Sequence, residues 1–214
     1  MKKLHALAPL LLTVAGFVFM GALGIRRLYG LGVTMSGALV ATGFGLYGAW
    51  LLWESRVSVR EVDKDSVDRD RGTMEFAAFA KLSLLTGALL PATVPVVWLA
   101  VVGLVLMVLG IVIRGSSVRE LGTAYSHRIR LPELPLIVSG PYRFVRHPAY
   151  LGTLLAHTGV VFLLPNPWSI GALMLLWCPA VMVRTIWEDR YLRSVPEYVR
   201  YAERVRWSLF PGIY

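Results

Sequence analysis

The run from Val96 to Ile113 reads V-V-W-L-A-V-V-G-L-V-L-M-V-L-G-I-V-I and contains no charged residue. Its length is close to the roughly 20 apolar residues that a helix needs to cross the hydrocarbon core of a bilayer. The whole chain is 56% hydrophobic and 16% charged, and its mean hydropathy is +0.61. Because segments in a bilayer must satisfy their own backbone hydrogen bonds, the sequence predicts an all-α integral membrane protein.

Other apolar runs flank this segment on both sides. They are Leu7–Ile25, Leu31–Trp53, Phe76–Leu90, Ala149–Leu164 and Pro167–Val183. The last two are short and are separated by L-P-N-P, which predicts a helical hairpin over residues 149–183. Together the runs predict a helical bundle of about five to six transmembrane helices. The first run is longer than the roughly 7–15 apolar residues of a signal peptide, so we expect an uncleaved membrane helix.

The basic residues indicate how the bundle is oriented. If both termini are cytoplasmic, most of the 22 lysines and arginines fall on the cytoplasmic side. This is the distribution that membrane proteins show, and it accounts for the net charge of +9 without nucleic acid as a partner. We therefore expect a multi-pass protein with both termini in the cytoplasm.

The chain divides into two parts at the end of the uncharged run. Residues 1–113 hold the first membrane helices, and residues 114–214 hold most of the polar motifs and the hairpin. Between two spans, residues 54–75 mix acidic and basic side chains, which is typical of a solvated linker or of an amphipathic helix on anionic lipid.

Two glycine patterns lie in the span Leu31–Trp53. Residues 43–48 match G-x-G-x-x-G, but this dinucleotide fingerprint requires a preceding strand, so we reject it here. Small residues recur every four positions at Gly37, Ala41, Gly45 and Ala49, which favours close helix packing within one chain or between two. The sequence leaves the oligomeric state open.

A polar cluster precedes the hairpin. Residues 140–152 read G-P-Y-R-F-V-R-H-P-A-Y-L-G, so Arg143, Arg146 and His147 meet the membrane surface, where an uncompensated polar group is costly. A residue before proline avoids helical geometry, so His147 lies in a break before a helix whose free N–H groups suit a carboxylate or ribose oxygens. Since no second histidine or cysteine stands near it at ligand spacing, we expect no metal.

A second polar region follows the hairpin. Residues 184–201 read R-T-I-W-E-D-R-Y-L-R-S-V-P-E-Y-V-R-Y, and the hairpin returns them to the side of the first cluster. Arg184 and Glu188 are four apart and share a helix face, so they form either a local salt bridge or part of a shared site.

These two regions resemble the isoprenylcysteine carboxyl methyltransferase family, and phospholipid methyltransferases share much of the pattern. The resemblance covers about residues 118–214 and is carried by R-H-P-x-Y-x-G and the acidic pair, in which Asp189 stands where glutamate is usual. It implies a membrane enzyme that uses S-adenosylmethionine in a cytoplasmic-side pocket. The residues that it assigns to the cofactor are Tyr142, His147, Pro148, Tyr150, Gly152 and Glu188. It places Arg146 and Arg184 near the methyl acceptor, with Glu188 as a further catalytic residue.

The resemblance also implies a lipophilic acceptor that enters from the bilayer. A carboxylate, such as that of a prenylated cysteine, is ionised at neutral pH and needs no base, but it needs a cation such as an arginine fork to hold it. A phospholipid amine would need a base, for which Glu188 is the nearest candidate.

Two other classes remain. Membrane sterol reductases that use NADPH share an H-P-N-Y-x-G-E segment, but here Ala149 replaces the asparagine and Thr153 the glutamate. A membrane scaffold or small transporter would use its arginines only as anchors at the interface. Binding of S-adenosylhomocysteine, of NADPH or of neither separates the three.

Overall fold

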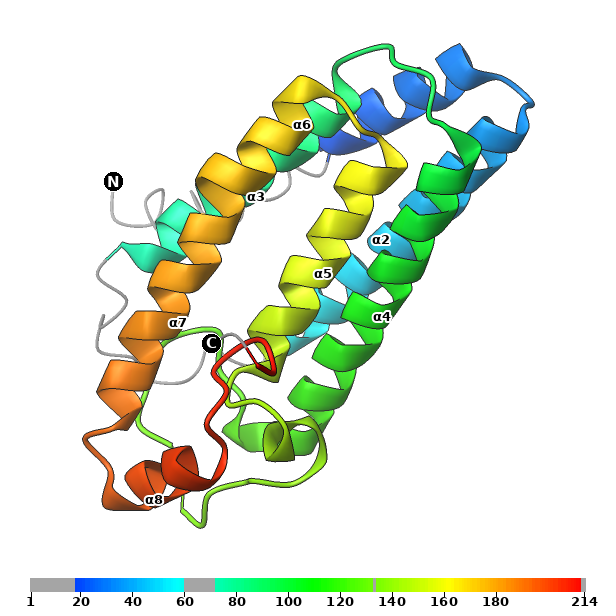
Figure 1. Cartoon of the computed structure of the whole chain (residues 1–214). Helices are drawn as coiled ribbons and strands as arrows, with labels where there is room; N and C mark the ends of the chain where they lie inside the picture. Colours follow the sequence, from blue (N-terminus) through cyan, green and yellow to red (C-terminus); the bar gives the residue numbers. More distant parts are fainter. Residues whose placement is uncertain (1–17, 60–71, 133, 213–214) are drawn as a thin grey trace.

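A computed structural model describes residues 18–59, 72–132 and 134–212, and every regular element among them is helical (Figure 1). Residues 18–31 form a helix. The elements that follow are α2 (Met35–Val59), α3 (Thr73–Leu89), α4 (Val97–Leu121), α5 (Pro148–Leu163), α6 (Pro167–Ala172), α7 (Cys178–Leu192) and α8 (Pro196–Arg204). Short 3-10 turns occupy Gly122–Ala124 and Gly140–Arg143, and a π-helical segment, Leu173–Trp177, joins α6 to α7.

Three helical stretches in the described residues are long and apolar enough to cross a membrane. They are Met35–Arg56, Val97–Ala124 and Pro167–Leu192, and the shorter apolar helix Pro148–Leu163 lies beside them. The predicted all-α membrane bundle is thereby confirmed, whereas the number of five to six spans stays a prediction. Residues 7–17 of the first expected span and residues 60–71 of the expected linker lie outside the described residues.

The hairpin over residues 149–183 forms, but its second helix is longer than predicted. At its start, Asn166 Oδ1 accepts hydrogen bonds from the backbone nitrogens of Trp168 and Ser169, both at 3.0 Å, in a capping box. From there α6, the π-helical segment and α7 run without a break to Leu192. Pro179 lies within this stretch and donates no backbone hydrogen bond, and the π-helical segment directly precedes it, but the helix continues through Arg184 to Leu192.

Glycines allow α4 and α5 to pack with their backbones in contact. A Cβ atom on Gly110 would lie 2.4 Å from the carbonyl oxygen of Gly152, and one on Gly152 would lie 2.6 Å from the backbone nitrogen of Arg114. Gly103 and Gly159 repeat this arrangement further along the two helices. Such close approach, typical of membrane helices, fixes the start of α5 against the polar end of α4.

The stripe of small residues on α2 has a different environment. Ala41, Gly45 and Ala49 are exposed, and a Cβ atom on Gly45 would meet no atom of the described structure within 4 Å. Gly37 is buried, but packing of the other three positions within the chain is not seen among the described helices, and packing between two chains stays a prediction.

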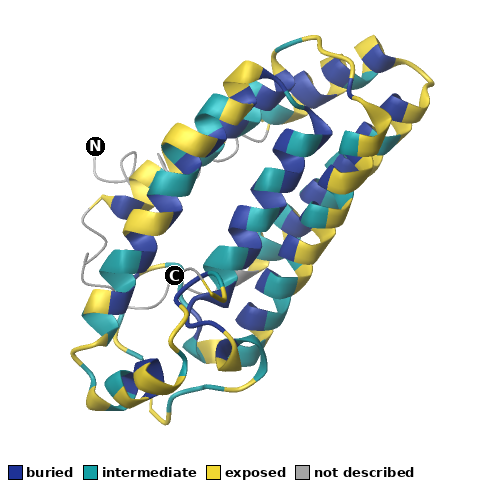
Figure 2. Cartoon of the chain, viewed as in Figure 1, coloured by how far each residue is buried: buried dark blue, intermediate teal, exposed yellow. Residues whose placement is uncertain are grey.

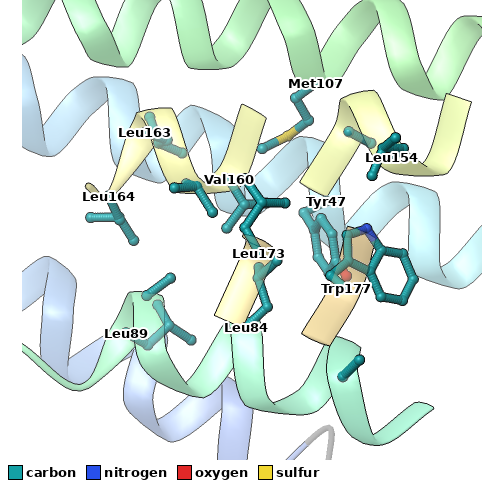
Figure 3. Packing of buried hydrophobic residues seen from close by; sticks show 14 of the residues in the cluster. Tyr47, Leu84, Leu89, Met107, Leu154, Val160, Leu163, Leu164, Leu173 and Trp177 are labelled. Carbon is teal, nitrogen blue, oxygen red and sulfur yellow. The ribbon is translucent and has the colours of Figure 1, made fainter. Parts of the chain in front are cut away.

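Burial follows the pattern of a bundle in lipid. Figure 2 shows exposed residues along the outer faces of α4 and α7, and on α4 these include Trp98, Val105 and Val112. Inside the bundle, buried side chains from the helix at residues 18–31, from α2 to α5, from the π-helical segment and from α7 form one core. Among them are Leu84, Met107, Val160, Leu163 and Trp177 (Figure 3). Apolar side chains thus lie both inside the bundle and on its outer faces. The outer faces are therefore suited to contact with lipid.

We predict that Gly110→Ala destabilises the protein. Its new methyl group would overlap backbone atoms of α5, and overpacking of this kind costs about 1–3 kcal/mol. Thermal unfolding in detergent should show a lower melting temperature, by about 2–4 °C per kcal/mol for a chain of this size.

Gly115→Ala is the matched control on the same helix. A Cβ atom there meets no described atom within 4 Å, so alanine should leave the melting temperature unchanged or raise it. Equal effects of the two substitutions would show that the close contact of α4 and α5 does not stabilise the fold.

Candidate functional site

The polar regions on both sides of the hairpin meet at one end of the bundle. The end of α7, the segment 122–147 and α8 lie together there in Figure 1, at the bottom of the view. They surround a cavity of about 620 Å³, to which α3, α4 and α5 also contribute. Of the residues predicted for the site, those that line it are Tyr142, Arg146, His147, Tyr150, Arg184 and Glu188. Pro148 and Gly152 lie outside this lining: Pro148 begins α5, and Gly152 faces α4.

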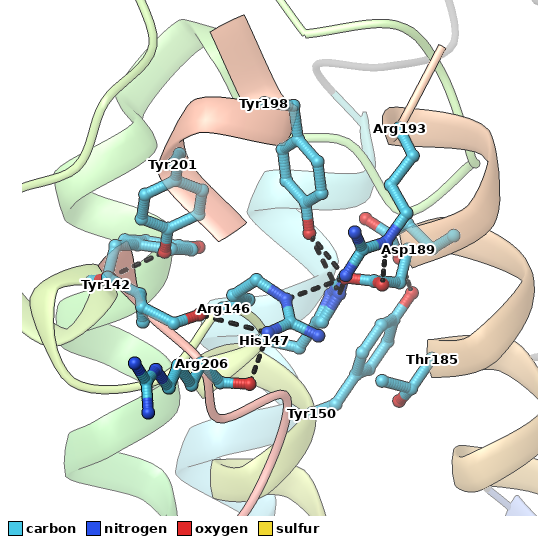
Figure 4. Close-up of polar contacts among 12 residues, drawn as sticks. Tyr142, Arg146, His147, Tyr150, Thr185, Asp189, Arg193, Tyr198, Tyr201 and Arg206 are labelled. Atoms are coloured by element: carbon cyan, nitrogen blue, oxygen red, sulfur yellow. Dashed lines mark hydrogen bonds and ion pairs between the residues drawn. The ribbon is translucent and has the colours of Figure 1, made fainter. Parts of the chain in front are cut away.

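The carboxylate of Asp189 is the centre of a buried network at the edge of the cavity (Figure 4). Arg146 Nε donates to it at 2.8 Å, the Tyr198 hydroxyl at 2.8 Å and Arg193 Nε at 2.9 Å. His147 Nε2 lies 3.4 Å from the same carboxylate. The Asp189 side chain is only 11% exposed, so these donors replace the water that a free carboxylate would bind.

Arg146 joins this network to the C-terminal segment. Its guanidinium also donates to the carbonyl oxygens of Val205, at 2.9 Å, and Arg206. Burial alone would lower the pKa of Arg146, but the hydrogen bond and charge of Asp189 outweigh it and raise this pKa above its usual value. The backbone nitrogen of His147 donates to the carbonyl oxygen of Ser208 at 2.9 Å, so the segment 205–208 holds the R-H-P loop in place.

The tyrosines of this network are hydrogen-bond donors at neutral pH. Burial and the negative charge of Asp189 raise the pKa of Tyr198 well above its usual range. Burial, followed by the charge of Glu188, does the same for the pKa of Tyr142. Burial also raises the pKa of Tyr201, whose hydroxyl donates to the carbonyl oxygen of Tyr142 at 2.6 Å.

A second chain of hydrogen bonds crosses the cavity wall from α7 to α5. The Tyr150 hydroxyl donates to Glu188 and accepts from Arg184 Nε at 2.9 Å. Within the described residues, no direct ion pair joins Arg184 to Glu188. These two residues, four apart on α7, are instead linked through the Tyr150 hydroxyl. Arg184 also donates to the hydroxyl of Thr73 at 3.1 Å and to the carbonyl oxygen of His127. Its fork thus ties α7 to α3, α5 and the segment after α4.

The sequence analysis did not assign three other polar residues, Arg114, Glu54 and Lys81, to this region. Arg114, which follows the uncharged run, makes two hydrogen bonds to Glu54 at the end of α2 and donates to the Tyr125 hydroxyl at 2.9 Å. Glu54 was expected in a linker, and its position directly after an apolar run was the available signal. Lys81 was treated only as a lysine that reaches the membrane surface, yet it lines the cavity.

Comparison with known proteins supports the family resemblance found in the sequence. Residues 101–194 match the model of the isoprenylcysteine carboxyl methyltransferase family. A probable protein-S-isoprenylcysteine O-methyltransferase from Oryza sativa subsp. indica is 36% identical over 138 residues, which cover 62% of this chain and 72% of the relative. Protein-S-isoprenylcysteine O-methyltransferase B of Arabidopsis thaliana is 30% identical over 113 residues, covering 50% of this chain and 57% of the relative. The Saccharomyces cerevisiae enzyme is 29% identical over 110 residues, or 49% of this chain and 46% of the relative.

An all-helical membrane bundle with a polar cavity at one end, together with these matches, defines an integral membrane methyltransferase. The chain belongs to the isoprenylcysteine carboxyl methyltransferase family, which confirms the resemblance found in the sequence.

We predict that Asp189→Ala strongly destabilises the protein. The change leaves the guanidinium of Arg146 buried without its carboxylate, and breaking a buried pair in this way costs about 3–5 kcal/mol. Thermal unfolding in detergent measures the loss.

The control is Glu197→Ala on α8, which removes an exposed pair with Arg200 worth about 0–1 kcal/mol. Similar melting temperatures for the two variants would contradict a central role for Asp189.

Proposed function

We propose that the cavity binds S-adenosylmethionine and that the enzyme transfers its methyl group to the carboxylate of an isoprenylcysteine acceptor. The observation that carries this proposal is that one cavity is lined by Arg146, His147 and Tyr150 of the R-H-P-x-Y-x-G motif and by Glu188 of α7. Tyr150 and Glu188, which are 38 positions apart, are joined there by a hydrogen bond. The names of the relatives supply the acceptor class.

The residues present fit the proposed cofactor. The cavity of about 620 Å³ lies within the range of small-molecule sites, roughly 300–1,000 Å³. Glu188 provides a carboxylate for the donor groups of the cofactor, and His147 and Tyr142 provide polar contacts beside it. When bound, S-adenosylmethionine supplies an electrophilic methyl group on a sulfonium.

Pro148 and Gly152 act indirectly in this proposal. Pro148 follows His147, the residue that caps the start of α5, and its ring fixes the first turn of that helix. Gly152 lets α5 contact the backbone of α4, which sets the position of Tyr150 two residues earlier. Both residues therefore place the groups that line the cavity.

The chain's own residues then hold and align the acceptor. Arg146 and Arg184 line the cavity and lend it positive charge, which favours a carboxylate. A carboxylate needs no general base, so alignment with the methyl donor is the main demand on the protein. The prenyl chain would enter from the bilayer, while the water-soluble cofactor enters from the cytoplasm.

This proposal includes the topology predicted from the basic residues. The enzyme is a multi-pass protein with both termini in the cytoplasm, and residues 114–214 form most of the catalytic region. The N-terminal part, residues 1–113, contributes α3 to the cavity wall through Met74 and Lys81.

We predict that Glu188→Gln weakens binding of S-adenosylhomocysteine by about tenfold to a hundredfold. This is the affinity expected to be lost when one or more hydrogen bonds to a charged group are removed. Calorimetric titration of the detergent-purified protein measures this affinity, with NADPH as a parallel titrant. Glu197→Gln, on the exposed side of α8, is the control. Near-normal affinity would remove Glu188 from the cofactor site, and binding of NADPH alone would favour a reductase.

We predict that Arg184→Lys lowers turnover by about tenfold or more, because lysine keeps the charge but cannot reach Thr73, Tyr150 and the His127 carbonyl oxygen together. The measurement is a methyl-transfer assay at saturating acceptor. Arg200→Lys, which is exposed, should retain full turnover. A fully active Arg184→Lys variant would show that the fork is dispensable.

A further inference from the structure

Lys81 lines the cavity from within the helical bundle. It is in α3, eight positions after Thr73, which corresponds to roughly 12 Å along the helix at about 1.5 Å per residue. Met74 and Ala77 from the same helix and Trp177 and Val181 from the helix opposite line the cavity with it. A lysine in this position places an ammonium group beside apolar side chains of two helices.

The ammonium group of Lys81 has no protein partner within the described part of the chain: it donates no hydrogen bond and forms no ion pair there. The charged groups whose fields reach it are Arg114 and Glu54, and these two are already paired with each other. Glu54 is hydrogen-bonded to Arg114, so its carboxylate is already occupied by another cation.

Two arginines of the cavity wall, Arg146 and Arg184, differ from Lys81 in this respect. Arg146 is held by Asp189 and by two carbonyl oxygens of the C-terminal segment. Arg184 donates to Thr73, to Tyr150 and to a backbone carbonyl oxygen. A ligand that used either arginine would have to share it with these partners, whereas Lys81 can use its full hydrogen-bonding capacity.

A cation among apolar side chains is costly unless it is paired or reached by water. Lysine side chains in a helix lean toward its N-terminus, so Lys81 extends back toward the polar end of the cavity, where Thr73 and Arg184 lie. An acceptor with a prenyl chain in the apolar part and a carboxylate at the polar part would place its charge beside this ammonium.

We propose that Lys81 binds the carboxylate of the methyl acceptor and selects acidic acceptors, an inference that rests on the proposed function. In the transfer, a carboxylate oxygen forms the new C–O bond with the methyl carbon. The C–S bond breaks, and its electron pair stays on sulfur, so the sulfonium becomes a neutral thioether and the carboxylate a neutral ester. Lys81 then loses its counter-charge, which favours release of the ester.

The same charge discriminates against the other acceptor class. A phospholipid amine or its methylated products carry a positive charge, which the ammonium of Lys81 repels. Lys81 is thus a specificity-determining residue that separates acid from amine acceptors.

The test compares Lys81→Met, which keeps the approximate length without the charge, with Lys81→Arg, which keeps the charge. Leu82→Met is the matched control, because Leu82 is the next residue in α3 and is 46% exposed on the outer surface. Each variant is assayed with N-acetyl-S-farnesylcysteine as acceptor, with its neutral carboxamide as competitive inhibitor, and with S-adenosylhomocysteine in calorimetry.

For Lys81→Met we expect the KM for N-acetyl-S-farnesylcysteine to rise about tenfold or more, because one charge-assisted hydrogen bond to its carboxylate is lost. The inhibition constant of the neutral carboxamide and the affinity for S-adenosylhomocysteine should stay within about twofold of wild type, and Lys81→Arg should recover most of the acceptor affinity. A merely structural role would weaken acid and carboxamide alike.

Two results would overturn the inference alone: an unchanged KM for the acid in Lys81→Met, or equal losses for the acid and the carboxamide. If the wild-type protein instead methylates no isoprenylcysteine carboxylate, the proposed function fails and this inference falls with it. The two failures are distinguished because the second is seen before any substitution is made.

Discussion

The negative charge of Asp189 must be compensated inside the protein, because little water reaches it. Its partners come from three parts of the chain that are otherwise separate: Arg146 in the R-H-P loop, Arg193 after α7 and Tyr198 in α8. Arg146 extends the network to the carbonyl oxygens of residues 205–206. One buried carboxylate thus joins the loop before α5 to the whole C-terminal region, and the shape of the cavity depends on it.

Most of the transmembrane helices could be predicted from the apolar runs of the sequence. Val96–Ile113 predicted α4 because an uncharged segment of this length has one stable form in lipid. The ends of the helices could not be predicted in this way, because hydropathy marks the membrane boundary and not the residue at which helical hydrogen bonding ends. α4 continues to Leu121, where Gly122 with a φ of 54° ends it, and α7 continues to Leu192.

The residues that line the cavity were predictable where they belong to a motif of the family that the chain resembles. The resemblance singled out the R-H-P-x-Y-x-G motif and Glu188, and in the structure Tyr150 does meet Glu188. Arg114 and Glu54 are 60 positions apart on different helices, and no spacing rule links such a pair. Lys81 was recognised only as a charge near a helix start, because the sequence does not show which face of α3 points into the bundle.

The contact between residues 205–208 and the R-H-P loop has a consequence for biosynthesis. These residues follow all the described membrane helices, so they leave the ribosome after those helices have been made. Until they pair with the backbone of Arg146 and His147, the loop lacks the acceptors that hold it. A chain caught during membrane insertion therefore has its helices in place but an unfinished cavity, which delays methyl transfer until synthesis has passed this segment.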